Sequence, residues 1–315
     1  MKKGILVLII FGSIATTVGA VVFGIGLAND INALQAHKET HEYELTEAFN
    51  SINIEGDSGD FTFIYNSENV NKVVAEEDKY FTTSVGVTDN VLTISNKNNK
   101  KWYENFFYSV SPKITVYLAN TDYQNLVVNN STGDINVPGD FTFDNVAIKV
   151  STGDINFKST VKDALAITSS TGNHVLTDAS MKSLSLEAST GRIELNNVLV
   201  ENDINLKTST GNMKLTGVKA TNLTTTCSTG GVTLANVEVS NHIYNKASTG
   251  DITYLDSDAS TIQIETSTGD VNLNLLTPKI MSVSTKTGDV DVPTSLTGGL
   301  CQITTSTGDI TVRFK

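Results

Sequence analysis

The chain has 315 residues, of which 39% are hydrophobic and 18% are charged, so it can bury a sizeable core. Its two cysteines cannot supply a disulfide scaffold, and its stability must come from packing. The 34 acidic residues outnumber the 22 basic ones and give a net charge of −12. This balance excludes general binding to nucleic acid, which needs clustered Lys and Arg against phosphate.

Residues 1–28 differ from the rest of the chain, because Lys2 and Lys3 precede an uncharged stretch at 4–28. A helix of that length could cross a hydrocarbon core of ~30 Å. We therefore expect an N-terminal transmembrane helix at 1–28, with the membrane as a partner through residues 4–28.

The charges that flank this stretch set its expected orientation. The positive-inside rule predicts a single-pass protein of the cell membrane, with a cytoplasmic N-terminus and with residues 29–315 extracytoplasmic. A cleaved signal peptide is the alternative, since Gly26 and Ala28 are small enough for a peptidase site.

Two segments precede the regular part of the sequence. Residues 29–48 are polar and lack a convincing apolar face, which indicates a spacer. Residues 49–125 alternate apolar and polar residues without a strict repeat, as at Ile52 and Ile54. This pattern predicts irregular β coils and a cap.

The remaining sequence repeats with a period of 19 or 20 residues. Thr-Gly recurs ten times, with its glycine at positions 133, 153, 172, 191, 211, 230, 250, 269, 288 and 308. Such a period is typical of a solenoid. The columns seven residues before and four residues after each glycine are apolar, and alternation at period two indicates strands. The predicted fold class is all-β, a β-helix-like solenoid of 19–20-residue coils, regular over residues 126–315.

Each coil is expected to contain a strand, a tight Ser-Thr-Gly-Asp turn with its glycine at positive φ, a second strand and a polar return. Four large apolar side chains contribute ~6–12 kcal/mol per coil, whereas ordering a coil costs ~29 kcal/mol. Stacking of neighbouring coils must therefore supply the difference. The column five residues before the glycine is broken by Thr225 and Asn245.

Some residues in the inward columns need separate expectations. His174 interrupts an apolar column, and we expect local slippage to turn Val175 inward in its place. Cys227 and Cys301 fall on inward columns four repeats apart in the sequence. That separation corresponds to ~19 Å, too far for a disulfide, so both are predicted to be free thiols.

Several segments together resemble a known family. They are the N-terminal apolar stretch, the Ser-Gly-Asp at 58–60 followed by Phe-Thr-Phe, the run Ser-Pro-Lys-Ile-Thr-Val-Tyr-Leu at 111–118 and the serial Ser-Thr-Gly-Asp-Ile units. Over residues 49–315 the chain resembles the bacterial DUF4097 family of putative adhesins. The resemblance implies a β-helix-like cell-envelope protein connected with adhesion or envelope stress. It implies no catalytic residues, since the repeated residues are those that a turn and a core require.

The last four coils carry an acidic residue directly after the glycine, at Asp251, Asp270, Asp289 and Asp309. Unit charges ~4.8 Å apart repel by ~3.5 kcal/mol at an effective dielectric constant of 20. Calcium could relieve this repulsion, and so could backbone amides and turn hydroxyls. Because the chain lacks the glycine-rich repeat of calcium-loaded β-rolls, we expect turn-forming carboxylates without a metal. A cation ladder is the weaker alternative.

One segment, 97–108, abandons the repeat and concentrates aromatic and basic residues. They are Lys97, Lys100, Lys101, Trp102, Tyr103, Phe106, Phe107 and Tyr108. These aromatics could cap the first strands of the solenoid. Alternatively, the eight residues form a binding patch for glycan, anionic wall polymer or lipid headgroups.

The expected function is therefore non-enzymatic: a membrane-anchored adhesin-like protein that needs no cofactor and binds through its solenoid surface. The expected partners are cell-envelope glycan, an anionic polymer or a membrane protein, and not nucleic acid. An envelope-stress sensing subunit that acts with a membrane partner is the alternative.

A polysaccharide-cleaving β-helix is less favoured. Neighbouring coils could present carboxylates ~5–5.5 Å apart, and Arg192 would mark a basic site. A catalytic pair, however, needs unlike environments, whereas these aspartates occupy equivalent turns.

Overall fold

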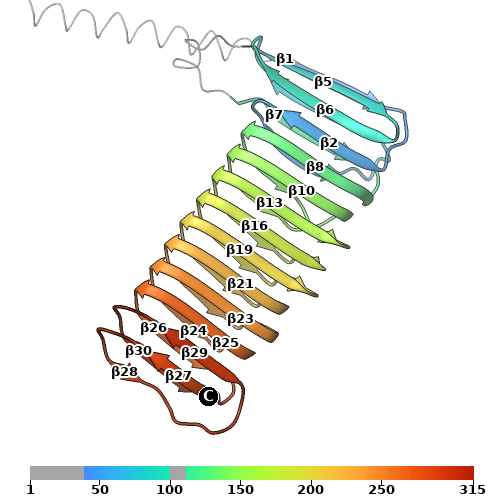
Figure 1. The fold of residues 1–315 in the computed structure, drawn as a ribbon. Helices are drawn as coiled ribbons and strands as arrows, with labels where there is room; N and C mark the ends of the chain where they lie inside the picture. Colours follow the sequence, from blue (N-terminus) through green and yellow to red (C-terminus); the bar gives the residue numbers. More distant parts are fainter. Residues whose placement is uncertain (1–38, 100–110) are drawn as a thin grey trace, which may run out of the picture.

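The computed structural model describes residues 39–99 and 111–315, and these residues form strands and connecting turns without a helix. Two sheets, of 14 and 16 strands, stack coil upon coil into a rod (Figure 1). Parallel pairing between successive coils confirms the predicted all-β solenoid.

The described residues of the irregular N-terminal part form seven strands. They are β1 (Glu39–Leu45), β2 (Ser51–Gly56), β3 (Asp60–Tyr65), β4 (Asn71–Glu77), β5 (Phe81–Thr88), β6 (Val91–Asn98) and β7 (Lys113–Leu118).

In the repeats, one strand precedes each Thr-Gly turn and one follows it. The preceding strands are β8 (Asp122–Thr132), β10 (Thr142–Thr152), β13 (Ala164–Thr171), β16 (Ser183–Thr190), β19 (Asp203–Thr210), β21 (Lys219–Thr229), β23 (Glu238–Thr249), β25 (Asp258–Thr268), β27 (Ile280–Ser284) and β29 (Leu300–Thr304). The following strands are β9 (Ile135–Val137), β11 (Ile155–Phe157), β14 (His174–Thr177), β17 (Ile193–Asn196), β20 (Met213–Thr216), β22 (Val232–Ala235), β24 (Ile252–Leu255), β26 (Val271–Leu275), β28 (Val290–Asp291) and β30 (Ile310–Phe314). Short strands at the return corner are β12 (Thr160–Val161), β15 (Ser180–Met181) and β18 (Leu199–Val200).

The core consists of the columns that the repeat predicts. Residues seven positions before the glycine pair in register from coil to coil, beginning with Leu126, Val146, Leu165, Leu184 and Ile204, and all five are buried. The ten Thr-Gly glycines have φ between 127° and 152°, as expected for their turns. Periodicity in the sequence therefore translates directly into stacking.

The order of the coils differs from the order of the sequence at both ends. At the N-terminal end, β2 lies between β6 and β8, and β3 lies between β7 and β9. At the C-terminal end, β29 lies between β25 and β27, and β30 lies between β26 and β28. The last coil in the sequence is thus an inner layer, and the preceding one forms the end of the rod.

Antiparallel strands cover the N-terminal end. β5 pairs with β6, β4 pairs with β7, and β1 pairs with β4. Residues 29–48 were expected to be a polar spacer, but residues 39–45 form β1. Tyr43 and Leu45 of this strand pack against the core, so the segment has an apolar side after all.

The predicted localisation as a single-pass membrane protein needs correction. No helix in residues 39–99 and 111–315 is long and apolar enough to cross a membrane. The predicted anchor at 1–28, with its membrane contact at 4–28, lies outside the described residues.

Candidate binding groove

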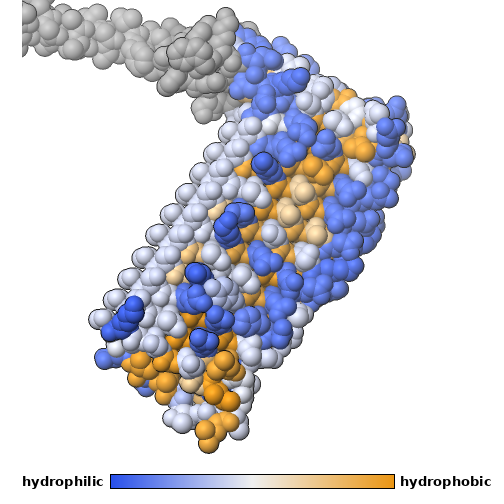
Figure 2. Space-filling model, in the orientation of Figure 1, coloured by the Kyte–Doolittle hydropathy of each residue, from blue (hydrophilic) through white to orange (hydrophobic). Residues whose placement is uncertain are grey.

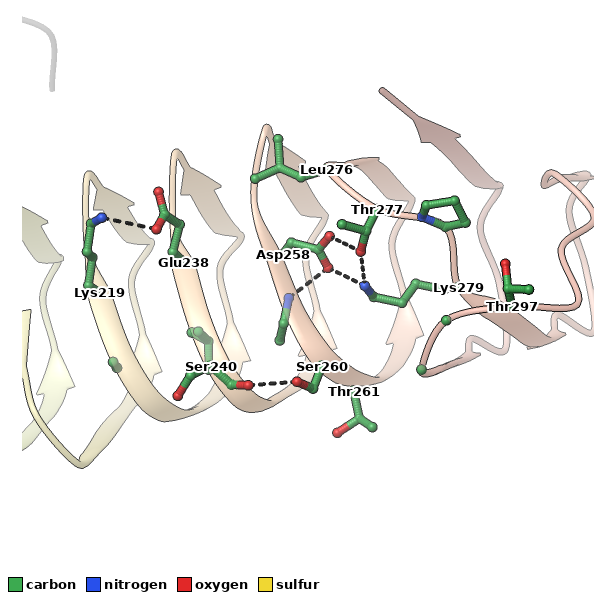
Figure 3. Close-up of a pocket in the computed structure, with 16 residues that line it drawn as sticks. Lys219, Glu238, Ser240, Asp258, Ser260, Thr261, Leu276, Thr277, Lys279 and Thr297 are labelled. Atoms are coloured by element: carbon green, nitrogen blue, oxygen red, sulfur yellow. Dashed lines mark hydrogen bonds and ion pairs between the residues drawn. The ribbon is translucent and has the colours of Figure 1, made fainter.

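A groove opens on the side of the rod near its C-terminal end (Figure 3). Its volume is about 920 Å³, and residues from β21, β23, β25 and two return loops line it. The lining residues that matter below are Lys219, Ala220, Glu238, Val239, Ser240, Asp258, Ala259, Ser260, Thr277, Lys279, Gly298 and Gly299.

The groove has an apolar floor formed by Ala220, Val239 and Ala259. The return-corner column runs, coil by coil, through Phe143, Val161, Met181, Val200, Ala220, Val239 and Ala259. Phe143 fills its layer completely, whereas Ala220 and Ala259 leave space above a buried floor. The two alanines thus stand at the groove where other coils carry larger side chains such as Phe143 and Met181.

Two crossing loops form the far wall. The return at 276–279 leads outward to β27, and the return at 292–299 leads back inward to β29. Where they meet, a Cβ on Gly298 would lie 1.9 Å from the carbonyl oxygen of Pro278, and one on Gly299 would lie 1.8 Å from that of Ser260. Glycine is required at this crossing because the backbones leave no room for a side chain.

A buried ion pair holds the crossing together. Lys279 Nζ lies 2.7 Å from Asp258 Oδ1, and the two side chains are only 4% and 11% exposed. The Thr277 hydroxyl donates a hydrogen bond of 2.6 Å to Asp258 Oδ2, and the backbone N–H of Ala259 donates one of 2.8 Å to Oδ1. Because removing one partner would leave a buried charge, the pair fixes the loop that carries Lys279 against β25.

The second carboxylate of the groove is paired as well. Glu238 Oε2 lies 3.0 Å from Lys219 Nζ at the exposed rim. The hydroxyl of Ser260 donates a hydrogen bond of 2.7 Å to the carbonyl oxygen of Ser240. The groove therefore offers apolar floor, hydroxyl groups and two neutralised ion pairs.

The predicted aspartate ladder exists, in the spatial order Asp251, Asp270, Asp309, Asp289. Each of the first three accepts, through Oδ1, a hydrogen bond from the backbone N–H of the next aspartate, at 2.9, 2.9 and 2.8 Å. The carboxylates thus tie adjacent turns together. Within residues 39–99 and 111–315, no group of three or more His, Cys, Asp or Glu side chains is arranged to hold a metal ion.

Almost all of the predicted binding patch lies outside the described residues. Of its eight residues only Lys97 is described, as an exposed residue of β6. Lys100, Lys101, Trp102, Tyr103, Phe106, Phe107 and Tyr108 lie outside the described residues.

Three further sequence expectations have clear outcomes. His174 itself is buried and stays in register with Ile155 and Ile193, so the expected slippage toward Val175 is wrong. Arg192 is exposed, with Nε 3.5 Å from Glu194 Oε2.

Cys227 and Cys301 are buried free thiols, as predicted. Because the last two coils change places, three layers and not four separate them.

Sequence reasoning missed the groove. Asp258 begins β25 and Lys279 ends the return before β27, and the repeat does not constrain either position. The alanines of the return-corner column and the Gly298-Gly299 pair can be seen in the sequence, but neither indicates a ligand.

Solved structures share this fold. A putative adhesin from Parabacteroides distasonis ATCC 8503 is 16% identical with a TM-score of 0.53, and the match covers 75% of this chain and 96% of that one. A putative adhesin from Parabacteroides merdae ATCC 43184 is 18% identical with a TM-score of 0.53, covering 75% and 95%. At these identities the similarity establishes the fold alone.

No curated protein matches the chain. The family described as Toastrack DUF4097 matches at residues 49–205 and again at 200–315, which together span nearly all of the described solenoid. The chain therefore belongs to the Toastrack DUF4097 family.

Proposed function

We propose that this protein is a non-enzymatic binding protein of the adhesin type and that it holds its ligand in the C-terminal groove. The observation that carries the proposal is the groove itself, an open hollow with an apolar floor whose ionised side chains neutralise one another. The description of two proteins of the same fold as putative adhesins agrees with it.

The composition of the groove favours a neutral glycan chain as ligand. Sugar hydroxyls can exchange hydrogen bonds with the serines at its edge, and the C–H faces of a sugar ring can lie on Ala220, Val239 and Ala259. An anionic polymer is disfavoured because the chain carries a net charge of −12.

The same side chains argue against catalysis. Asp258 and Glu238 stand on adjacent coils, but each is paired with its own lysine, at 2.7 and 3.0 Å. A glycoside hydrolase needs one carboxyl group to stay protonated while the other is ionised. Because a lysine already engages each carboxylate here, neither is free to protonate a leaving group or to activate water.

Occlusion of the groove tests the proposal. Ser240 is exposed, so Ser240→Trp would fill the groove without disturbing the core. Ser185→Trp on the exposed face of β16 is the matched control. Binding of the full chain to immobilised neutral cell-surface polysaccharide is measured by surface plasmon resonance.

We expect Ser240→Trp to weaken binding at least tenfold and Ser185→Trp to leave it unchanged. Equal binding by both variants would rule out the groove as the ligand site. Release of shorter saccharides from the polysaccharide during incubation would contradict the non-enzymatic assignment.

A further inference from the structure

The two ends of the rod differ in how the core is covered. At the N-terminal end, the inward residues Leu92, Ile94, Ile114 and Val116 are buried beneath antiparallel strands. At the C-terminal end, β27 and β28 are the last strands of their sheets in the part of the chain that the structure describes. Within the described residues, no strand therefore covers the end of the solenoid core there.

Comparison of the last two layers shows how much apolar surface this leaves. The inward positions of the end coil are Met281, Val283, Val290 and Val292, and none of them is buried. The matching positions one layer inside are Cys301, Ile303, Ile310 and Val312, and all four have no exposed surface. The side chains of these four columns are buried in the inner layer and partly or fully exposed in the end layer.

Further apolar side chains surround this end, which we call the C-terminal tip and define as residues 280–300. Ile280 and Leu300 are 44% and 46% exposed, and Leu296 is 90% exposed. Figure 2 shows hydrophobic surface gathered at this end of the rod. Exposed contiguous apolar surface of this kind marks an interaction site.

The backbone of the tip offers a second means of attachment. As the last strand of its sheet, β27 has one edge that pairs with β29 and a second edge without a partner strand among residues 39–99 and 111–315. Such an edge readily pairs with a strand of another chain.

The distribution of charge along the chain favours a second copy as the partner of this edge. Residues 276–315 contain four basic and three acidic residues, a net charge of +1, which leaves −13 for residues 1–275. Two copies that meet tip to tip bring near-neutral ends together and keep their acidic residues 1–275 apart. Side-by-side association would bring these acidic parts together, where like charges repel.

We propose that the C-terminal tip binds the tip of a second copy of this chain, with β27 pairing antiparallel to its counterpart about a two-fold axis at Ser282. In this register Met281 faces Val283 of the copy and Val283 faces Met281, so inward residues meet inward residues. Ile280 and Ser284 pair in the same way on the outward face. The two cores thereby become one.

The size of the tip suits such an interface. A stable specific interface engages ~20–30 residues on each partner. The end coil, residues 280–299, supplies a whole layer of this size, and a two-fold interface uses the same surface on both copies. The proposed binding groove lies beside the tip, and the proposal does not depend on its ligand.

Site-specific crosslinking of the full chain tests the proposal. Directly opposed residues of an antiparallel pair have Cα atoms ~4.5–5.5 Å apart, which lies within the range of a disulfide. Ser282→Cys should therefore give a disulfide-linked dimer under mild oxidation. Ser185→Cys is the control, since Ser185 occupies the same outward column in the middle of the rod.

We expect most Ser282→Cys protein to migrate as a dimer without reductant and the Ser185→Cys and unmodified chains to stay monomeric. Adding Val283→Lys to Ser282→Cys places two charges in the interface and should abolish the dimer. Val283 is only partly buried at the end of the core, so circular dichroism should show an intact fold. Equal crosslinking at positions 282 and 185, whether absent or present, would overturn the proposal.

Discussion

His174 is a titratable group inside an otherwise apolar column. Its Nε2 lies 2.7 Å from the hydroxyl oxygen of Ser169, and its Nδ1 has no hydrogen-bond partner among the residues that the structure describes. Burial lowers the pKa of this imidazole from 6.5 to about 4, although nearby Asp154 acts in the opposite direction. The folded protein therefore holds the residue neutral at pH values where the unfolded chain protonates it.

This shift predicts that acid destabilises the protein. Because the unfolded state binds the proton first, the stability associated with neutral His174 is complete above pH 6.5 and is lost as pH falls toward 4. The loss is on the order of 3 kcal/mol. His174→Ile with Ser169→Ala, which copies the neighbouring coil, should reduce the fall in melting temperature between pH 7 and pH 4.5. An unchanged fall would show that other groups cause the acid sensitivity.

The turn glycines predict a second effect at the scale of one residue. Gly211 has φ 148°, and a Cβ there would lie 1.9 Å from the carbonyl oxygen of Gly191 in the layer beside it. Gly211→Ala should therefore lower the free energy of unfolding by about 2–5 kcal/mol. Gly86→Ala is the control, because a Cβ on Gly86 meets no atom within 4 Å. Urea denaturation measures both, and similar losses in the two variants would refute the explanation.

Strand packing joins three buried side chains, Thr225 and Asn245, which interrupt one apolar column of the repeat, and Tyr254. Thr225, Asn245 and Tyr254 are buried on β21, β23 and β24. The Asn245 side-chain amide donates a hydrogen bond of 2.6 Å to the Thr225 hydroxyl, and the Tyr254 hydroxyl donates one to Asn245 Oδ1. These buried polar side chains thus satisfy one another's hydrogen-bonding groups. Tyr254 comes from a different column than Thr225 and Asn245, so no single column of the repeat reveals the contact.

A double-mutant cycle on this network has a definite expected sign. Tyr254→Phe removes the donor to a buried amide oxygen and should cost about 1–3 kcal/mol of unfolding free energy. Asn245→Leu alone leaves the tyrosine hydroxyl without its partner and should cost a similar amount. The double variant should lose less than the sum, as judged by thermal unfolding. Additive losses would mean that the hydrogen bond does not couple the two side chains.

The aspartate turns lead to a prediction about calcium. Asp251, Asp270 and Asp309 already accept backbone N–H groups, so their charge is stabilised without an ion. Millimolar calcium should therefore leave the melting temperature of the full chain nearly unchanged. A saturable rise that disappears in Asp270→Asn with Asp289→Asn would contradict this expectation, because a bound ion stabilises by mass action.

At the scale of the whole molecule, the sequence determines the layers better than their order. The columns around each Thr-Gly turn define strands, inward positions and register, and these agree with the structure except at His174, which takes the inward position expected of Val175. The same uniformity explains why the exchanged end coils were not predicted. Since every layer presents similar columns, Ile262 can stack on Met281 or on Cys301, and the columns do not distinguish the two.

The candidate site was predictable to a smaller extent. Asp258 begins β25 and Lys279 lies in the return at 276–279, where the repeat columns do not specify the side chains. Loop crossings depend on backbone paths and close contacts, as at Gly298, and a repeat pattern contains no information about them.

The inserted layer predicts what truncation should do. Deleting residues 300–315 removes β29 and β30, which are the parallel partners of both the inner strands β25 and β26 and the end strands β27 and β28. We expect the amides of β27 to lose protection from hydrogen exchange and the melting temperature to fall. If the coils stacked in sequence order, β27 would pair with β25 and remain protected after the deletion.

The interleaved ends also constrain how the molecule can change in evolution. A duplicated repeat cannot be appended beyond either terminal coil without undoing a crossing, but it can be inserted anywhere in the uniform middle of the rod. Each such duplication adds one layer of ~4.8 Å and leaves both ends intact. Copy number therefore sets the distance between the two ends of the rod, and selection can alter that distance without changing either end.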